Sequence, residues 1–405
     1  MSSGESQSRH RFPRFLPCTL VLGLLLLLTG CETVPDRYSL PRTGDPVVDG
    51  KVQLQYAPAK DKVMWNYRVA ASALRRNQPD EARVQLDTAL PLVGGILANG
   101  ADAKKARRLF SGEDSKIFIG EPYERVMAFY YRAILYWQDG QADNARACYR
   151  TGQFIDSDAE ADTYKGDYIL LDYLEGFITA KLAGDGSDAL ARARKNSKLR
   201  LPDYDTEANL IVFGEFGDGP RKYAGGEYSE QLRFRTFNST TSFARLSIGD
   251  TVVAIQTYDD LNFQATTRGG RVMDHILGRK AVFKSATDSI GDVALMGGVV
   301  AASQINRWDG RKSHNAENLA LALGAVGLIS KLASKATVTE ADTRDWNNLP
   351  QRLAWGCARV APGDYSAKLE FFDTQGRLLG IKTRMIPVTV KADGDTVLFV
   401  SELTR

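Results

Sequence analysis

Histidine, which most metal sites and many acid–base catalysts use, is scarce in this sequence. There are three histidines, His10, His275 and His314, and no metal-ligand spacing surrounds them. No nucleophile elbow, phosphate-binding loop or dinucleotide fingerprint occurs in a suitable context. We therefore expect no metal and no cofactor, assign no catalytic residue, and predict a protein that is not an enzyme.

An excess of charge of either sign is also lacking. The 52 basic and 49 acidic side chains give a formal net charge of +3. Arg9, Arg11, Arg14 and Glu5 lie in a segment that we expect to be removed. Subtracting these three basic and one acidic side chains leaves 49 and 48. Nucleic-acid binders usually carry a strong basic excess, so we expect no nucleic-acid partner.

The N-terminal apolar run is too short to span a bilayer. It covers 18–28, about 11 residues, whereas a spanning helix needs about 20. A polar, arginine-containing stretch precedes the run, and Leu28-Thr29-Gly30-Cys31 ends it. A charged region followed by a short apolar region is typical of an export signal, so we predict a signal peptide over 1–30.

The tetrad 28–31 resembles the lipobox of bacterial lipoproteins. That resemblance implies cleavage between Gly30 and Cys31, a diacylglyceryl group on the Cys31 thiol, and a membrane as one partner. Glu32 follows the cysteine, which by the enterobacterial sorting rule implies an outer-membrane lipoprotein facing the periplasm; the inner membrane and the cell surface are the alternatives. The alternative for Cys31 is a chance cysteine after an ordinary signal peptide. Prolines and few large apolar residues predict an extended tether over 31–60.

Two further cysteines, Cys148 and Cys357, lie in different expected domains. A long-range disulfide is one interpretation in an oxidising compartment. Two buried free thiols are the interpretation that we favour.

A helical apolar period fills 61–198, and it repeats. Turn-forming residues separate paired helices at 77–80 and 139–142. A third, looser copy covers about 167–196, with Gly176 at a small-residue position. The small residues that align between the first two copies are Ala70 with Ala133, Ala82 with Ala145, and Ala89 with Gly152. The pattern resembles tetratricopeptide repeats, and a generic helical bundle is the alternative.

The segment 119–125, Ile-Gly-Glu-Pro-Tyr-Glu-Arg, begins the second copy and is typical of a helix start. It resembles a segment in a bacterial lipoprotein family of uncharacterised function with tetratricopeptide-like repeats, and the likeness extends to 342–350, Asp-Thr-Arg-Asp-Trp-Asn-Asn-Leu-Pro. The resemblance implies architecture and location but no reaction. Aromatic residues of this helix are most simply core. Alternatively, some line a concave surface for an envelope protein or peptide; the candidates are Tyr123, Arg125, Tyr130 and Tyr131.

From about 205 the apolar period changes to two. Expected strands at 353–360 and 365–372 are joined by a Pro-Gly turn and read as a hairpin, followed by a strand at 377–384. Pro387 is expected to interrupt the chain before a last pair of strands around Asp393-Gly394-Asp395. Further strands are expected at 207–216, 229–237, 243–247 and 251–258. About eight strands with antiparallel turns predict a β-sandwich over 205–405. Glycine-rich stretches predict an inserted helical hairpin at about 288–340.

The sequence thus predicts a multidomain α+β envelope lipoprotein that acts as a non-enzymatic binding scaffold. Helical repeats would contact envelope proteins or peptides, and lipid would place the protein near them. Two alternatives stay open. One is an envelope enzyme acting on glycan or peptide, and the other is a homo-oligomer assembled through the glycine-rich helices.

Overall fold

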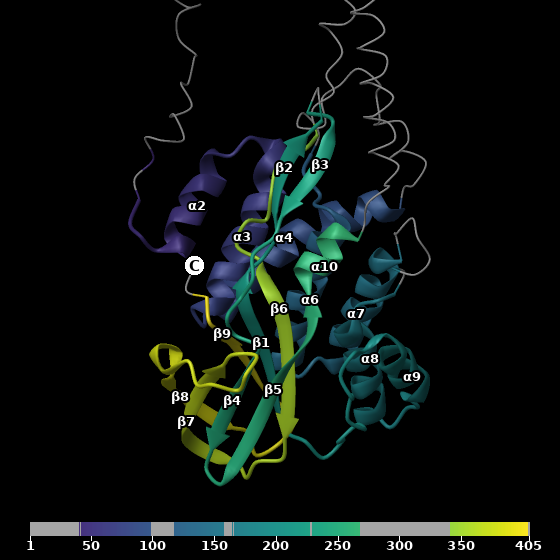
Figure 1. Cartoon of the computed structure of the whole chain (residues 1–405), viewed down its shortest axis with the longest axis vertical. Coiled ribbons are helices and arrows are strands. Elements are labelled where there is room, and N and C mark those ends of the chain that lie inside the picture. The colour runs from purple at the N-terminus through teal and green to yellow at the C-terminus, as the bar shows by residue number, and fades with distance from the viewer. Residues whose placement is uncertain are drawn as a thin grey trace, which may run out of the picture. The chain divides into compact units, whose positions relative to one another are not determined.

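The computed structural model describes residues 40, 42–98, 117–157, 164, 166–226, 229–267 and 341–403. The predicted signal peptide, Gly30, Cys31 and the predicted helical hairpin at about 288–340 lie outside these residues. The described residues from Arg42 onward belong to one compact unit, Arg42–Arg405. Its described part is a mixed α+β structure, with helices first and a sheet after them (Figure 1).

Helices that are consecutive in the chain form three helical hairpins, each joined by a short turn. The pairs are α3 (Lys62–Arg75) with α4 (Pro79–Ala98), α6 (Pro122–Gln138) with α7 (Ala142–Asp156), and α8 (Ile169–Lys181) with α9 (Ser187–Asn196). Neighbouring pairs also touch, α4 against α6 and α7 against α8. The helices therefore stack in chain order.

The same turn ends the first helix of every pair. A residue with positive φ follows the helix, namely Asn77 (φ 54°), Gly140 (φ 75°) or Ala183 (φ 60°). The next backbone N–H then donates to a carbonyl five residues back, at 2.8 Å in all three turns. This is the left-handed ending that satisfies the last carbonyls of a helix. Each of these residues lies seven positions after the small residue aligned in the sequence: Ala70, Ala133 and Gly176.

Small residues let the paired helices approach closely. Ala70, Ala82, Ala133 and Ala145 are fully buried. A Cβ added to Gly176 on α8 would lie 2.7 Å from the Ala189 side chain of α9 and still closer to the Tyr204 hydroxyl. The aligned alanines are therefore buried, and at Gly176 the two helices of a pair approach closely.

The helix start predicted at 119–125 is confirmed. Glu121 is the N-cap of α6 and Pro122 its first residue. The Glu124 carboxylate accepts from the Glu121 backbone N–H at 2.6 Å, and the Glu121 side chain accepts from the backbone at Glu124. This reciprocal capping box satisfies two N–H groups that a helix start leaves without partners.

The predicted tether over 31–60 differs from the structure in its second half. Residues Pro46–Tyr56 form helix α2, followed by the 3-10 turn η1 (Ala59–Asp61). The Asp45 side chain caps α2 by accepting from the N–H of Val47 at 2.8 Å, and Val47 is buried in the core. Pro46 begins this helix because its missing N–H and fixed φ suit a first turn. Proline was therefore a helix-start signal at this position and not a mark of extended chain.

The strands form one seven-stranded sheet in the order β8-β7-β4-β5-β6-β1-β9, and a separate hairpin of β2 with β3. All pairs are antiparallel except β1 with β9, which is parallel. The strands are β1 (Leu210–Asp218), β2 (Arg221–Gly225), β3 (Gln231–Arg235), β4 (Phe243–Ile248), β5 (Thr251–Asp260), β6 (Pro350–Ala358), β7 (Gly363–Phe372), β8 (Arg384–Val390) and β9 (Thr396–Ser401).

The predicted β-sandwich is replaced by a single, nearly closed sheet. Its edge strands β8 and β9 are consecutive in the chain, and Arg384 at the start of β8 donates to the carbonyl of Ser401 at the end of β9. Apolar side chains fill the interior: Leu210, Val212, Leu246, Ile255, Leu369, Phe371, Val388 and Val400 among others. Curling one sheet around its own side chains buries one face without a second sheet.

Three expectations for the strands are wrong in detail. The stretches expected to pair as a hairpin, 353–360 and 365–372, lie largely in β6 and β7, which are separated in the sheet by β5 and β4. The strand expected at 377–384 is a connection containing the 3-10 turn η4 (Gly380–Lys382). Pro387 lies inside β8, where its missing N–H is tolerated because β8 is an edge strand.

Helices and sheet share one core. Ile211 and Phe213 of β1, Trp355 of β6 and Phe399 of β9 pack with the helices, while alternate residues of the same strands point to the sheet interior. The expected helical domain 61–198 and β domain 205–405 are therefore parts of one compact unit. No helix within the described ranges has both the length and the apolar character that crossing a bilayer requires.

Candidate functional site

The four residues nominated for partner binding are buried. Tyr123, Tyr130 and Tyr131 are 1%, 2% and 0% exposed, and Arg125 is 7% exposed. The tyrosines contact the chain's own strands. Tyr123 packs edge-on against Phe234 of β3, Tyr130 against Phe213 of β1, and Tyr131 against Phe399 of β9.

The aromatic side of these helices is therefore covered by the protein's own sheet. The first helix of each pair, α3, α6 and α8, contacts a strand of the sheet. Tyr173 and Phe177 of α8 continue the same aromatic contact onto Trp355 of β6, with ring centroids 5.0 and 5.5 Å apart. Edge-to-face aromatic pairs of this kind add to area burial. In the structure these residues form an internal interface with the chain's own sheet.

The two segments that carried the family resemblance, 119–125 and 342–350, meet at a buried carboxylate. Glu124 of α6 is 0% exposed and accepts from the backbone N–H of Trp346 at 2.8 Å. Its other oxygen accepts from Lys222 of β2, whose side chain is 2% exposed. Lys222 also donates to the carbonyl of Arg344 at 2.9 Å. We call Glu124, Lys222, Asp345 and Trp346 the Glu124 cluster.

The Glu124 cluster carries a second acidic group, Asp345. Burial, and then the nearby Glu124 charge, raise the pKa of Asp345 to about 6. Burial also raises the pKa of Glu124, and Lys222 opposes that shift. The Asp345 carbonyl accepts from Arg68 of α3 at 3.1 Å, and the Trp346 ring stacks on Tyr67 at 4.4 Å. The cluster therefore ties α3, α6, β2 and the 342–350 segment together.

A second buried ion pair joins the helices to β1. Arg75 of α3 donates to Glu215 of β1, and both side chains are 1% exposed. The hydroxyl of Tyr131 donates to the other Glu215 oxygen at 2.7 Å. An unpaired charge here would be costly, so the three groups are mutually required.

A third buried carboxylate caps a helix. Asp259 of β5 accepts from the backbone N–H groups of Ile169 and Leu170 at 2.8 and 2.9 Å, at the start of α8. Burial raises the pKa of Asp259 to about 7, although the two hydrogen bonds oppose the shift. The helix N-terminus favours the negative form, and dehydration disfavours it.

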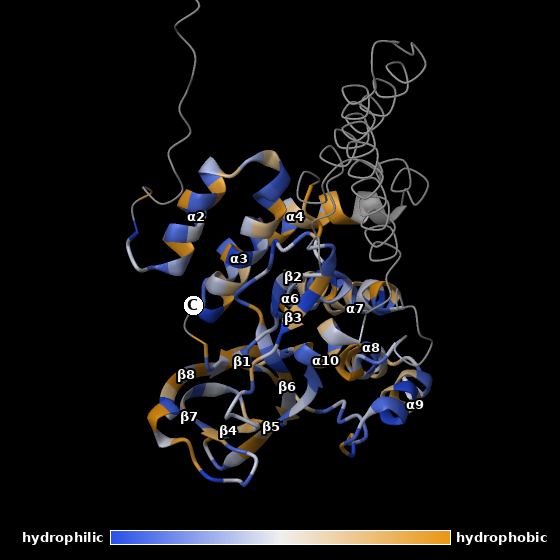
Figure 2. Cartoon of the chain, turned by 45° about the horizontal axis from the view of Figure 1, so that its top comes forward, coloured by the Kyte–Doolittle hydropathy of each residue, from blue (hydrophilic) through white to orange (hydrophobic). Residues whose placement is uncertain are grey.

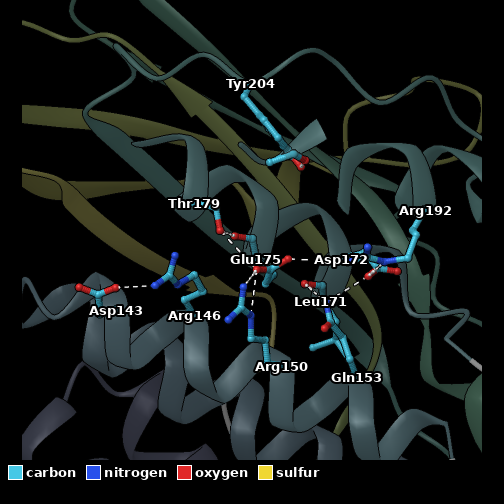
Figure 3. A network of polar contacts seen from close by, with 11 residues as sticks. Asp143, Arg146, Arg150, Gln153, Leu171, Asp172, Glu175, Thr179, Arg192 and Tyr204 are labelled. Carbon is cyan, nitrogen blue, oxygen red and sulfur yellow. Dashed lines mark hydrogen bonds and ion pairs between the residues drawn. The ribbon is translucent and has the colours of Figure 1, made fainter. Parts of the chain in front are cut away.

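A polar network at the surface links α7, α8 and α9 (Figure 3). Glu175 of α8 accepts from Arg150 of α7 at 2.8 Å and pairs with Arg192 of α9 at 3.7 Å. Arg192 also donates to Asp172 at 3.0 Å. The two arginines are 60% and 51% exposed, so each pair adds under about 1 kcal/mol.

These groups are suited to holding the fold and not to chemistry on a substrate. Glu124, Glu215 and Asp259 are enclosed and already accept from fixed donors. Within the described ranges no group of three or more histidine, cysteine or acidic residues could hold a metal ion. Cys148 and Cys357 are free thiols; Cys148 is buried, and Cys357 is partly buried. Burial raises their pKa values to about 11 and about 12, which keeps both thiols protonated and unreactive.

Sequence reasoning missed the three buried carboxylates as partners of distant donors. Glu215 had a visible signal, because it is a lone charge inside the apolar run 210–216. Asp259, and Lys222 as the partner of Glu124, had no such signal in the sequence, because each lies beside other polar residues. Their partners are 90 and 98 positions away in the chain.

No family model, no curated protein and no solved structure matches the chain. The resemblances to lipoproteins and to tetratricopeptide repeats therefore stay predictions.

Proposed function

We propose that this protein is a lipid-anchored scaffold of the bacterial envelope, which holds a rigid α+β body at a membrane surface for contact with other envelope proteins. The observation that carries the proposal is Leu28-Thr29-Gly30-Cys31 directly after a short apolar run. The buried ion pairs support the proposal of a rigid scaffold, because they stiffen the body and are unavailable to a substrate.

Metabolic labelling with an alkyne fatty acid tests the anchor. The wild-type chain is expected to incorporate label and to stay in the membrane fraction after an alkaline wash. Cys31→Ser should lose both properties. Cys18→Ser is the matched control because Cys18 lies inside the apolar run, and it should keep them. A wild-type chain that begins at Met1, or that carries an unmodified Cys31, would refute the anchor.

We further propose that the helix pairs are tetratricopeptide-like repeats. The identical turns at Asn77, Gly140 and Ala183, each seven positions after an aligned small residue, support this proposal. Because the first helices cover the sheet, a partner would contact the second helices. Val84 and Leu92 of α4 and Phe154 of α7 offer exposed apolar side chains there, at 60%, 50% and 67%.

Photocrosslinking tests this contact. A photoreactive amino acid at Val84 or Phe154 is expected to capture a discrete envelope protein in living cells. The control position is Val252 on β5, which is equally exposed at 60%. Equal capture from all three positions, or none from Val84 and Phe154, would remove the helical surface from the proposal.

A further inference from the structure

The connection between β7 and β8 presents apolar side chains to solvent on an ordered turn. Ile381 in η4 is 99% exposed, and Leu378 before η4 and Met385 at the start of β8 are 48% and 59% exposed. In Figure 2 the ribbon around β8 shows hydrophobic stretches at the edge of the molecule. Single exposed apolar residues are ordinary, but several gathered on one projecting turn point to a contact.

Backbone hydrogen bonds hold this turn in place. The N–H of Leu379 donates to the carbonyl of Phe371 at 2.7 Å, and the N–H of Lys382 donates to the carbonyl of Leu379 at 2.9 Å. Thr383 closes the turn onto Gly380 at 3.1 Å. Ile381 is thus displayed by a fixed backbone, and no packing within the described unit uses its side chain.

The charges beside these apolar side chains are arranged with cations outward. Arg377 is 73% exposed, whereas its partner Asp373 is 14% exposed. Lys382 is 31% exposed, whereas its partner Glu402 is 6% exposed. Arg384 is exposed as well. The turn therefore offers an apolar tip with cations around it, the combination that suits an anionic bilayer surface.

The turn lies on the same side of the unit as the start of α2, where the chain enters from the N-terminus (Figures 1 and 2). Contacts connect the two places. Asp45 pairs with Arg76 at 3.3 Å, and the adjacent Arg75 pairs with Glu215. The Glu215 carbonyl accepts from the N–H of Glu402, whose carboxylate holds Lys382 of the turn at 2.8 Å.

The length of chain before this unit limits its distance from the proposed anchor. Ten residues, 32–41, separate Cys31 from Arg42, and they can extend at most about 35 Å. Within that distance the entry side of the body can reach the bilayer surface.

We propose that the 377–385 turn is a membrane-docking element, which inserts Leu378, Ile381 and Met385 into the headgroup region of an anionic phospholipid surface. The proposal rests on the lipid anchor proposed above for orientation. The docking chemistry itself does not need the anchor, and the two can therefore fail separately.

Vesicle binding by the mature chain carrying Cys31→Ser tests the proposal without the lipid. We expect sedimentation with phosphatidylglycerol vesicles and much weaker binding to phosphatidylcholine vesicles. The triple variant Leu378→Ser/Ile381→Ser/Met385→Ser should bind about tenfold more weakly or worse. The control Val252→Ser, which changes an apolar residue of β5 that is 60% exposed, should bind as the parent does.

A fluorescence measurement keeps the test independent of the triple variant. Ile381→Cys, labelled with an environment-sensitive maleimide, should shift to the blue with phosphatidylglycerol vesicles, and labelled Val252→Cys should not. An unshifted label at position 381, or unchanged binding by the triple variant, would overturn the proposal. Loss of self-association in the triple variant, with no vesicle binding by the parent, would also overturn it and assign the turn to a second copy. Vesicle binding by a chain that proves not to be lipidated in cells would leave docking intact and refute only the anchor.

Discussion

Replacing Glu124 by glutamine is the sharpest test of the Glu124 cluster. Glutamine keeps the size of the side chain and an oxygen for the Trp346 N–H, but it removes the charge facing Lys222 and the oxygen that accepts from the Glu121 N–H. The lysine side chain is 2% exposed, so its ammonium would remain buried beside a neutral partner. Breaking a buried pair by removing one charge costs about 3–5 kcal/mol.

Urea unfolding of the mature Cys31→Ser chain, followed by circular dichroism, measures this cost. With an unfolding slope of about 3 kcal/mol per molar urea, the expected loss lowers the midpoint by about 1–1.7 M. Glu81→Gln is the control, because its partner Lys51 is 51% exposed and Glu81 itself is 23% exposed, and it should change stability by under about 1 kcal/mol.

A double variant separates the charge from the packing. Glu124→Gln/Lys222→Met removes both charges and keeps the hydrogen bond to Trp346. We expect the double variant to lose less stability than the two single variants lose together, and the difference should be about 2 kcal/mol or more. A Glu124→Gln midpoint that matches that of Glu81→Gln would refute the reasoning, and so would strict additivity in the double variant.

Three other outcomes are expected. Folding raises the pKa of Asp259 from 3.8 to about 7, so the native state binds this proton more tightly than the unfolded state does. The free energy of unfolding of the wild type should therefore fall as pH rises from about 4 to 7. Asp259→Asn lacks this titration, so in urea titrations its stability relative to the wild type should rise by up to about 4 kcal/mol across that range. Gly176→Ala should destabilise by about 1–3 kcal/mol in thermal melts because its Cβ meets α9, whereas Gly380→Ala, which meets nothing within 4 Å, should be neutral. Cys148, which is buried, should react with a thiol reagent at pH 8 only as fast as the protein unfolds, whereas the partly buried Cys357 serves as the faster internal reference; prompt reaction of Cys148 in the native state would contradict its burial.

Local features of the helical half were predictable from sequence because they depend on neighbouring residues. The start of α6 at Pro122, the buried small residues and the turns at 77–80 and 139–142 all follow from spacing within about a dozen positions. A helix period and a capping residue act through hydrogen bonds three to five positions apart. The positions of most strands were predictable for the same reason, since alternation is local.

Pairing between strands was not predictable. A Pro-Gly turn between 353–360 and 365–372 suggested a hairpin, yet β6 and β7 lie three steps apart in the sheet. The alternation of apolar and polar residues indicates which face of a strand is buried, but it does not indicate which strand pairs with it. Strand pairing depends on how well whole strands pack, and in this sheet β4 and β5 lie between β6 and β7.

The sequence by itself determined the small-residue register of the helix pairs, the capped start of α6, and an N-terminal signature that predicts lipid attachment at Cys31. Tertiary structure alone decided what covers the aromatic face of the first helices, because a helix carries no local record of what will pack on it. It also brought Glu124 to Lys222 and Trp346, and Asp259 to the start of α8. Buried charges need opposite charges or fixed donors in three dimensions, and a chain can supply these from any distance along its length.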